Sequence, residues 1–249
     1  GLCRADLPPC TESKLPFGFD IANQIIELIE NETEFSDRKI FKGDAKCQVT
    51  INTEKGLVEK VLISVCHDAK FTIQEVREYI ATLLSLHFGL TESNCELIIN
   101  PSGTWTIGGP EADCGLTGRK IVCDQYGGFT PVGGGAFSGK DPTKVDRSGA
   151  YMARKIACDV IDRFEEVNNV TVQLAYAIGC SEPVSVCANA IDKNGKKVQD
   201  RRLVGYYETK EQAETALQNY LLDFLYSIFI VHESTQQFSF CIEARKLIH

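Results

Sequence analysis

Residues 46–66 read KCQVTINTEKGLVEKVLISVC, and this stretch predicts two strands joined by a short turn. Residues 46–53 and 58–66 are rich in β-branched side chains, which favour strands. Between them, residues 54–56 end in glycine and suit a turn. The first structural unit that the sequence predicts is therefore a β-hairpin.

Amphipathic helices are predicted on both sides of this hairpin. Residues 17–30 place Ile21, Ile25, Leu28 and Ile29 on one helical face. In residues 72–89, Thr72 and Glu75 have the spacing of a capping box, and Gly89 stands where a helix commonly ends. The hairpin therefore gains helices that can cover one face of its sheet.

The rest of the chain repeats this order of strands and helices, which predicts an α+β fold with mixed or antiparallel sheets covered on one face. We expect short strands at 95–100 and 103–107, a long helix at 143–166, strands at 170–178 and 183–191, a helix at about 209–226, and a last strand at 236–242.

Composition excludes several classes of protein. The formal net charge of −8 argues against a dedicated nucleic-acid binder. The most apolar run, 221–231, is too short to span a membrane, and the amino terminus lacks the apolar core of a signal peptide. The 11 cysteines include no C-x-x-C pair, so reduced thiols in a cytoplasmic protein are expected.

Residues 108–142 differ from the rest, because they hold half of the chain's 20 glycines. A flexible linker of this kind is usually serine-rich and poor in apolar residues. This segment instead carries Tyr126, Phe129 and Phe137 together with fixed charges. We therefore favour a backbone built for close approach to a ligand.

Residues 133–141, GGGAFSGKD, partly mimic a phosphate-binding P-loop through Gly134, Gly139 and Lys140. Asp141 stands where that loop needs a hydroxyl to bind magnesium, and no strong buried strand precedes the segment. We reject the P-loop, but two of its features that bind anions remain. Glycines let backbone N–H groups approach an anion, and a lysine follows them.

Four cations, Arg119, Lys120, Lys140 and Lys144, gather in this region of an otherwise acidic protein. Their most sensible ligand is a polyphosphate, and a solvated charged loop is the alternative. Asp113 and Asp146 are then candidates to bind an ammonium group and a magnesium ion, respectively.

Two segments here, GGPEADCGLTGRKIVCDQYGG (108–128) and GGGAFSGKDPTKVDRSGAYMARKIA (133–157), resemble the signature segments of S-adenosylmethionine synthetases. Weaker similarity occurs at 43–51, 62–68 and 176–186. The resemblance covers roughly residues 1–190, and the tail at 191–249 departs from the family pattern.

The resemblance implies a fold of three similar sheet-and-helix subdomains, of which this chain carries two, at 1–107 and 108–249. ATP and L-methionine would bind between two subunits, and the apolar sheet faces would need a partner. The methionine sulfur would attack C5′ of ATP and expel triphosphate, which is hydrolysed to pyrophosphate and phosphate. Mg²⁺ and K⁺ would assist.

The resemblance also implies residue roles. Catalytic contacts to the polyphosphate fall to Lys46, Arg119, Lys120 and Lys140. The remaining ATP contacts fall to Asp44 near the ribose, Thr104, Trp105 stacked on adenine, Asp113, and Ala136 through its backbone. Asp113 and Lys144 would bind methionine, and Asp146 would bind a metal or its water shell.

The amino-terminal part of the family, with its H-P-D-K segment and catalytic histidine, has no counterpart in this sequence. Gly1 matches the last glycine of the family's G-D-Q-G segment, and residues 2–6 (LCRAD) are altered. Three hypotheses follow. The chain is one part of a split or multi-subunit synthetase, completed by an amino-terminal chain or a second synthetase subunit; a non-catalytic regulator of an active subunit; or another polyphosphate-binding protein.

Overall fold

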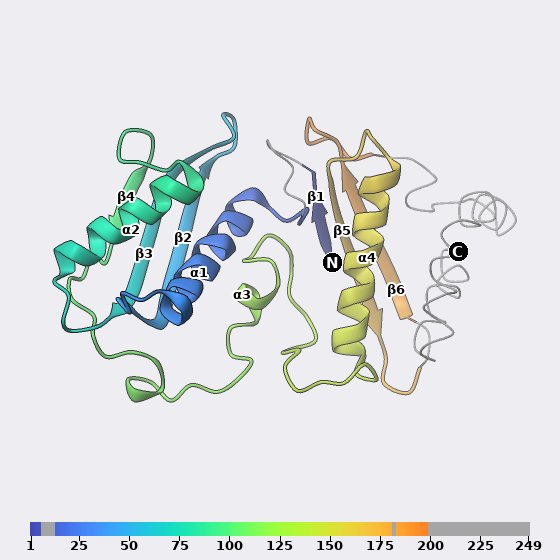
Figure 1. Cartoon of the computed structure of the whole chain (residues 1–249). Coiled ribbons are helices and arrows are strands. Elements are labelled where there is room, and N and C mark those ends of the chain that lie inside the picture. Colours follow the sequence, from blue (N-terminus) through green and yellow to red (C-terminus); the bar gives the residue numbers. More distant parts are fainter. Residues whose placement is uncertain (6–12, 181–182, 199–249) are drawn as a thin grey trace, which may run out of the picture. The chain divides into compact units, whose positions relative to one another are not determined.

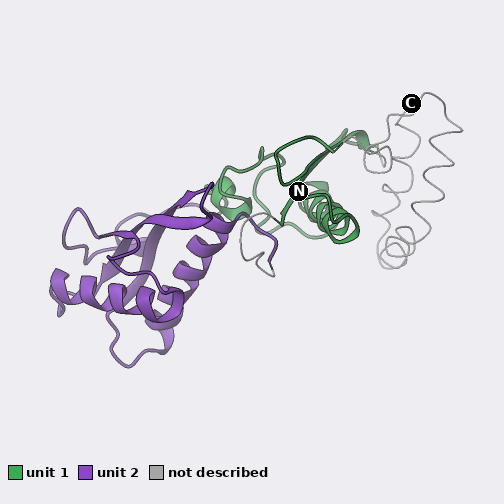
Figure 2. Cartoon of the chain, turned by 90° about the horizontal axis from the view of Figure 1, so that it is seen from above, with its two compact units in different colours: residues 1–6, 117–249 green, residues 7–116 purple. Residues whose placement is uncertain are grey.

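The computed structural model describes residues 1–5, 13–180 and 183–198 (Figure 1). The chain divides into two compact units, one of Gly1–Asp6 with Thr117–His249 and one of Leu7–Leu116 (Figure 2). The predicted domain boundary after residue 107 stays a prediction. The helix expected at 209–226, the strand expected at 236–242 and the apolar run 221–231 lie outside the described residues.

The unit Leu7–Leu116 is a mixed three-stranded sheet with two helices on one face (Figure 1). Strands β2 and β3 pair antiparallel, and β4 pairs parallel with β3, in the order β2-β3-β4. The elements are α1 (Phe17–Phe35), β2 (Phe41–Asn52), β3 (Leu57–His67), α2 (Ile73–Phe88) and β4 (Glu96–Ile99), followed by a short 3-10 turn, η1 (Gly109–Glu111). The predicted hairpin and both helices are confirmed.

The core of this unit lies between the sheet and its helices. Ile63 of β3 is fully buried and belongs to one cluster with Ile25 of α1 and Ile80 of α2. Each such side chain contributes about 1.5–3 kcal/mol by leaving water. Alternate residues of β3 face the helices, as the pleat of a half-covered strand requires.

The opposite face of this sheet corrects the expectation of a large apolar surface. Its cross-strand neighbours are Lys46 with Ser64, Gln48 with Leu62 and Ile98, and Thr50 with Lys60 and Glu96. Lys60 and Glu96 form an ion pair of 2.8 Å. Only Leu62 and Ile98 are apolar in this set, so the described face is mainly polar.

The strand expected at 103–107 is wrong, because this segment is a loop. Both main-chain polar groups of Trp105 bond to His67: the carbonyl accepts from the backbone N–H at 2.9 Å, and the N–H donates to the imidazole at 3.3 Å. A side chain thus replaces the second backbone hydrogen bond of a strand pair, and no regular pattern of strand hydrogen bonds forms.

The capping box of α2 gives a first prediction. The Thr72 hydroxyl accepts from the N–H of Glu75, and the Glu75 carboxylate accepts from the N–H of Thr72 at 2.8 Å. Thr72→Ala is expected to lower the free energy of unfolding by about 1 kcal/mol, because the N–H of Glu75 loses its acceptor at the start of the helix. Urea unfolding measures this. Thr82→Ala, in the exposed middle of the same helix, is the control and should cost less; an equal loss would contradict the capping role.

The other unit contains an antiparallel sheet covered by one long helix (Figure 1). Its elements are β1 (Leu2–Arg4), α3 (Ile121–Gln125), α4 (Val145–Arg163), β5 (Asn169–Tyr176) and β6 (Pro183–Ile191), with strand order β1-β5-β6. Ala153 and Ala157 of α4 pack with Val170 and Val172 of β5. Strands, helices and mixed or antiparallel sheets confirm the α+β class.

The nine cysteines that the structure describes are free thiols, and Cys47 lies on the helix-facing side of β2. Burial raises the pKa of Cys47 from 9.0 to about 12. The fold therefore favours the neutral thiol, and this contribution to stability is complete below pH 9 and is lost as the pH rises from 9 to 12.

We expect Cys47 to react with iodoacetamide far more slowly than the exposed Cys123 and Cys187 at pH 8. At pH 8, a thiol with a pKa near 12 has about a thousandfold less thiolate than a thiol with the ordinary value of 9.0, and the thiolate is the reactive species. Peptide mass spectrometry of the native chain measures the rates, with the urea-unfolded chain as control. Equal native rates at the three sites would contradict the burial of Cys47.

Every helix in the described part of the chain is too short or too polar to span a membrane.

Candidate functional site

Lys140 occupies the centre of the glycine-rich region. Its ammonium donates to the carbonyl of Gly134 at 2.9 Å and to Asp146 Oδ2 at 2.6 Å. An ammonium has three N–H donors, so one remains for an oxygen of a ligand. The side chain is 26% exposed, which places a fixed positive charge at an accessible but partly enclosed position.

Glycine is required where this loop meets the helix α4. Gly134 has φ +76°, and a Cβ there would lie 3.0 Å from Asp146 Oδ1. Gly135 and Gly139 also have positive φ angles, a conformation that glycine adopts without steric cost. The loop backbone can therefore lie directly against the first turn of α4.

The start of α4 fixes the end of the same loop. The N–H of Thr143 donates to Asp141 Oδ1 at 2.8 Å. Bonds from Thr143, first from its hydroxyl and then from its N–H, hold the pKa of Asp141 below its ordinary value. The Arg147 guanidinium donates to the carbonyl of Lys140 and lies 5.6 Å from the Tyr151 ring centre. Arg147 is a positioning residue that was absent from the predicted site, although its place in the first turn of the helix could have suggested it.

At Gly118, the segment 108–128 lies directly against the segment 133–157. Gly118 has φ +80°, and a Cβ there would lie 2.3 Å from the Cβ of Ala136. The backbone that leads into Arg119 and Lys120 thus packs on the loop that carries Lys140. Both cations are exposed, and no hydrogen bond or ion pair of their side chains occurs within the described part of the chain.

In the unit Leu7–Leu116, Asp44 anchors the turn at Gly109. Asp44 Oδ2 accepts from the N–H of Gly109 at 2.7 Å. At Gly108, a Cβ would lie 2.8 Å from Cys66 Sγ, so only glycine fits beside this carboxylate. The N–H of Asp113 donates to the carbonyl of Gly109 at 3.0 Å. Asp44 therefore positions the turn from which the exposed Asp113 projects.

The other predicted residues of this unit lie nearby in sequence or on the sheet. Trp105 is half-buried, and its indole N–H donates to the carbonyl of Ile107 at 2.7 Å, which fixes the ring. Thr104 is exposed beside it, and Lys46 is exposed on the polar sheet face.

The predicted site residues thus fall into two groups, one on each unit. Asp44, Lys46, Thr104, Trp105 and Asp113 belong to Leu7–Leu116, and Arg119, Lys120, Ala136, Lys140, Lys144 and Asp146 belong to the other unit. Within the second group, the structure brings Lys140, Asp146 and the loop of Ala136 together. Lys144 is the N-cap residue directly before α4 and has an exposed side chain.

The described residues form no metal site made of protein ligands alone. They contain no group of three or more histidine, cysteine, aspartate or glutamate side chains that could hold one. Asp146, the predicted metal ligand, has one oxygen bonded to Lys140. One carboxylate of this kind would hold Mg²⁺ only together with phosphate oxygens of a ligand, so no chemical step is assigned to a metal.

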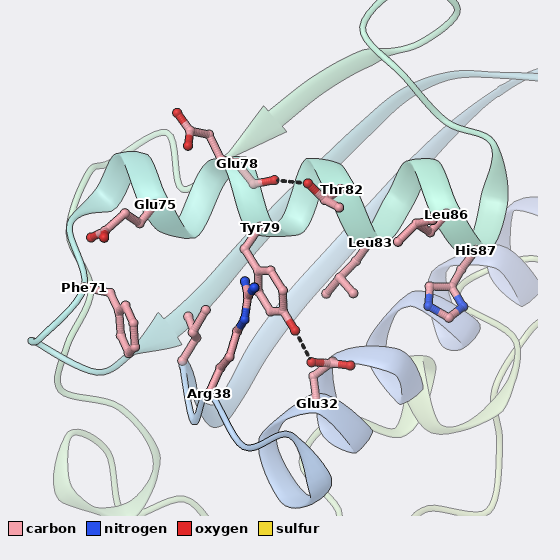
Figure 3. A pocket seen from close by; sticks show the side chains of 11 residues that line it. Glu32, Arg38, Phe71, Glu75, Glu78, Tyr79, Thr82, Leu83, Leu86 and His87 are labelled. Atoms are coloured by element: carbon pink, nitrogen blue, oxygen red, sulfur yellow. Dashed lines mark hydrogen bonds between the residues drawn. The ribbon is translucent and has the colours of Figure 1, made fainter.

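A cavity of about 860 Å³ lies elsewhere, between α1 and α2 (Figure 3). The Tyr79 hydroxyl donates to Glu32 inside it, and Arg38 lies 4.9 Å from the Tyr79 ring centre. Burial, first, and the bond to Glu32 raise the pKa of Tyr79. None of the predicted site residues lines this cavity.

Comparison with known proteins gives two family matches. Residues 9–105 match the central domain of S-adenosylmethionine synthetase, and residues 107–229 match its C-terminal domain. The second match runs past residue 190, where the predicted resemblance stopped.

Individual proteins agree with the family matches. The chain is 42% identical over 194 residues to the S-adenosylmethionine synthase of Pelagibacter ubique, covering 75% of this chain and 50% of that protein. It is 40% identical over 186 residues to that of Lacticaseibacillus casei, covering 72% and 47%. The solved structure of an unusual S-adenosylmethionine synthetase from Campylobacter jejuni has a TM-score of 0.69 at 28% identity, covering 82% of this chain and 54% of that one.

The chain spans about half the length of the curated relatives it matches. Its two family matches leave few residues of the described chain outside them, and the signature segments are those that build the Lys140 loop. The chain belongs to the S-adenosylmethionine synthetase family.

Proposed function

We propose that this chain takes part in the synthesis of S-adenosylmethionine from L-methionine and ATP, with release of phosphate and pyrophosphate. The observation that carries the proposal is the position of Lys140. Its ammonium is fixed by Gly134 and Asp146 and keeps one donor free, within a loop whose glycines bring backbone N–H groups close to a ligand.

The chemistry needs this arrangement because the leaving group is a triphosphate. When the methionine sulfur forms a bond to C5′, the C5′–O bond breaks and its electrons remain on the triphosphate. Cations already in place stabilise that charge without reorganising at the moment of reaction. Lys140 would supply this charge together with Arg119, Lys120 and Lys46.

The nucleoside and methionine contacts complete the proposal. Trp105 and Thr104 would bind adenine, Asp44 would lie near the ribose, and Ala136 would contact ATP through its backbone. Asp113 would bind the amino group of methionine, with Lys144 assisting. Magnesium and potassium stay expectations from the family resemblance.

The proposed enzyme is an oligomer in the cytoplasm, made of one or more kinds of chain. Because this chain matches about half of each relative, we propose that the catalytic histidine and its neighbours come from an amino-terminal synthetase segment. In a split or multi-subunit synthetase, that segment would lie on another chain or on a second synthetase subunit.

An activity assay tests this function. The chain is incubated with ATP and L-methionine, alone and with a co-purified amino-terminal synthetase segment, and S-adenosylmethionine and phosphate are measured. Activity in the mixture only is the expected result. No activity in either sample, together with tight binding to a complete synthetase, would overturn it in favour of a regulatory subunit.

A further inference from the structure

His67, at the end of β3, is fully buried and has no role in the proposed chemistry. Its imidazole Nε2 accepts from the N–H of Trp105 at 3.3 Å, and its backbone N–H donates to the carbonyl of Trp105 at 2.9 Å. One residue thus binds both main-chain polar groups of the only tryptophan in the chain.

The partners of His67 define one tautomer. A nitrogen that accepts from an amide N–H carries no proton, so Nε2 is unprotonated. The other nitrogen, Nδ1, lies 3.1 Å from the carbonyl of Asp68, which can only accept, so Nδ1 carries the proton. The imidazole is therefore neutral, and a protonated ring would turn an N–H toward the N–H of Trp105.

Two further side chains from β2 hold the same loop. Lys42 donates to the carbonyl of Thr106 at 2.9 Å, and Asp44 accepts from Gly109 at 2.7 Å. The Lys42 contact is exposed, and the contacts of Asp44 and His67 are part-buried, but His67 is itself fully buried. A buried imidazole cannot turn to water when its partner is lost, so its hydrogen bond is costly to break.

We propose that His67 is a positioning residue for adenine recognition, which sets the backbone of Trp105 through the Nε2 acceptor and thereby orients the indole. This inference rests on the proposed function only for the identity of the ligand. The coupling of His67 to Trp105 stands on the contacts alone.

The test compares His67→Asn with His67→Gln by Trp105 fluorescence, with and without ATP. Asparagine can replace the Nδ1 donor toward Asp68 but cannot reach the Nε2 position, whereas the longer glutamine places an oxygen near it. We expect His67→Asn to shift Trp105 emission to the red and to weaken ATP binding about tenfold, the cost of one hydrogen bond to a buried imidazole. His67→Gln should stay near the wild type, and His87→Asn, exposed on α2, should match it.

A folded His67→Asn protein with wild-type emission and ATP affinity would overturn the inference. If that variant does not fold, ¹⁵N NMR of the histidines in the unaltered chain decides: a proton on Nδ1 supports the proposal, and a proton on Nε2 refutes it. If ATP leaves Trp105 emission of the wild type unchanged, the proposed contact of Trp105 with adenine fails, while a difference between the Asn and Gln variants still supports the control of Trp105 by His67.

Discussion

Lys140→Ala is expected to lower the turnover of the reconstituted synthesis by about 10²–10³-fold, the loss typical of removing one preorganised group that stabilises transition-state charge. The same change should alter the free energy of unfolding by at most about 1 kcal/mol, since it removes one partly exposed ion pair. Stability should change little because Lys140 makes only two hydrogen bonds to the protein, at the surface of the loop. Turnover should change strongly because its third N–H donor is the one proposed to bind the polyphosphate. Initial rates and urea unfolding measure the two effects.

The helix α4 supplies a matched control. Lys155 and Asp159 form an ion pair of the same 2.6 Å length, away from the glycine-rich loop. Lys155→Ala should cost a similar amount of stability and leave the turnover unchanged. Equal turnover in the two lysine variants would contradict a specific role for Lys140.

Gly118→Ala is expected to reduce activity by about 10²-fold, because small misplacements of binding groups cost this much. The added methyl group would stand 2.3 Å from the Cβ of Ala136, and the φ of +80° is unfavourable for alanine. The segment that carries Arg119 and Lys120 must then separate from the loop of Lys140. Rates and ATP affinity should both fall.

Gly115→Ala is the control for this substitution. No atom lies within 4 Å of a Cβ at Gly115, and its φ is not in the left-handed region. Wild-type activity is expected there. If Gly118→Ala also kept full activity, the packing of the two glycine-rich segments would have no functional importance.

Local sequence patterns predicted most of the regular structure. The hairpin at 46–66 and the capping box of α2 depend on neighbouring residues, so composition and spacing were sufficient. Strand β1 was missed because three residues carry no periodic pattern, and it forms only by pairing with β5, more than 160 residues away. The segment 103–107 was misjudged because a side chain, His67, takes the place of a strand neighbour.

The candidate site shows the same limit. Glycine and lysine spacing indicated an anion-binding loop, and the family resemblance added the residue roles. Neither could show that Asp146 bonds to Lys140, that Arg147 holds the loop carbonyl, or that Asp44 anchors Gly109. These contacts depend on how the backbone turns at glycines with positive φ, which residue types alone do not specify.

Calorimetric titration of the chain with inorganic tripolyphosphate tests the anion site directly, without methionine, adenosine or a second polypeptide. We expect saturable binding that weakens as salt increases and is lost in Lys140→Ala but kept in Lys155→Ala. Absence of saturable binding, or equal affinity in both variants, would show that the Lys140 loop does not bind the leaving group.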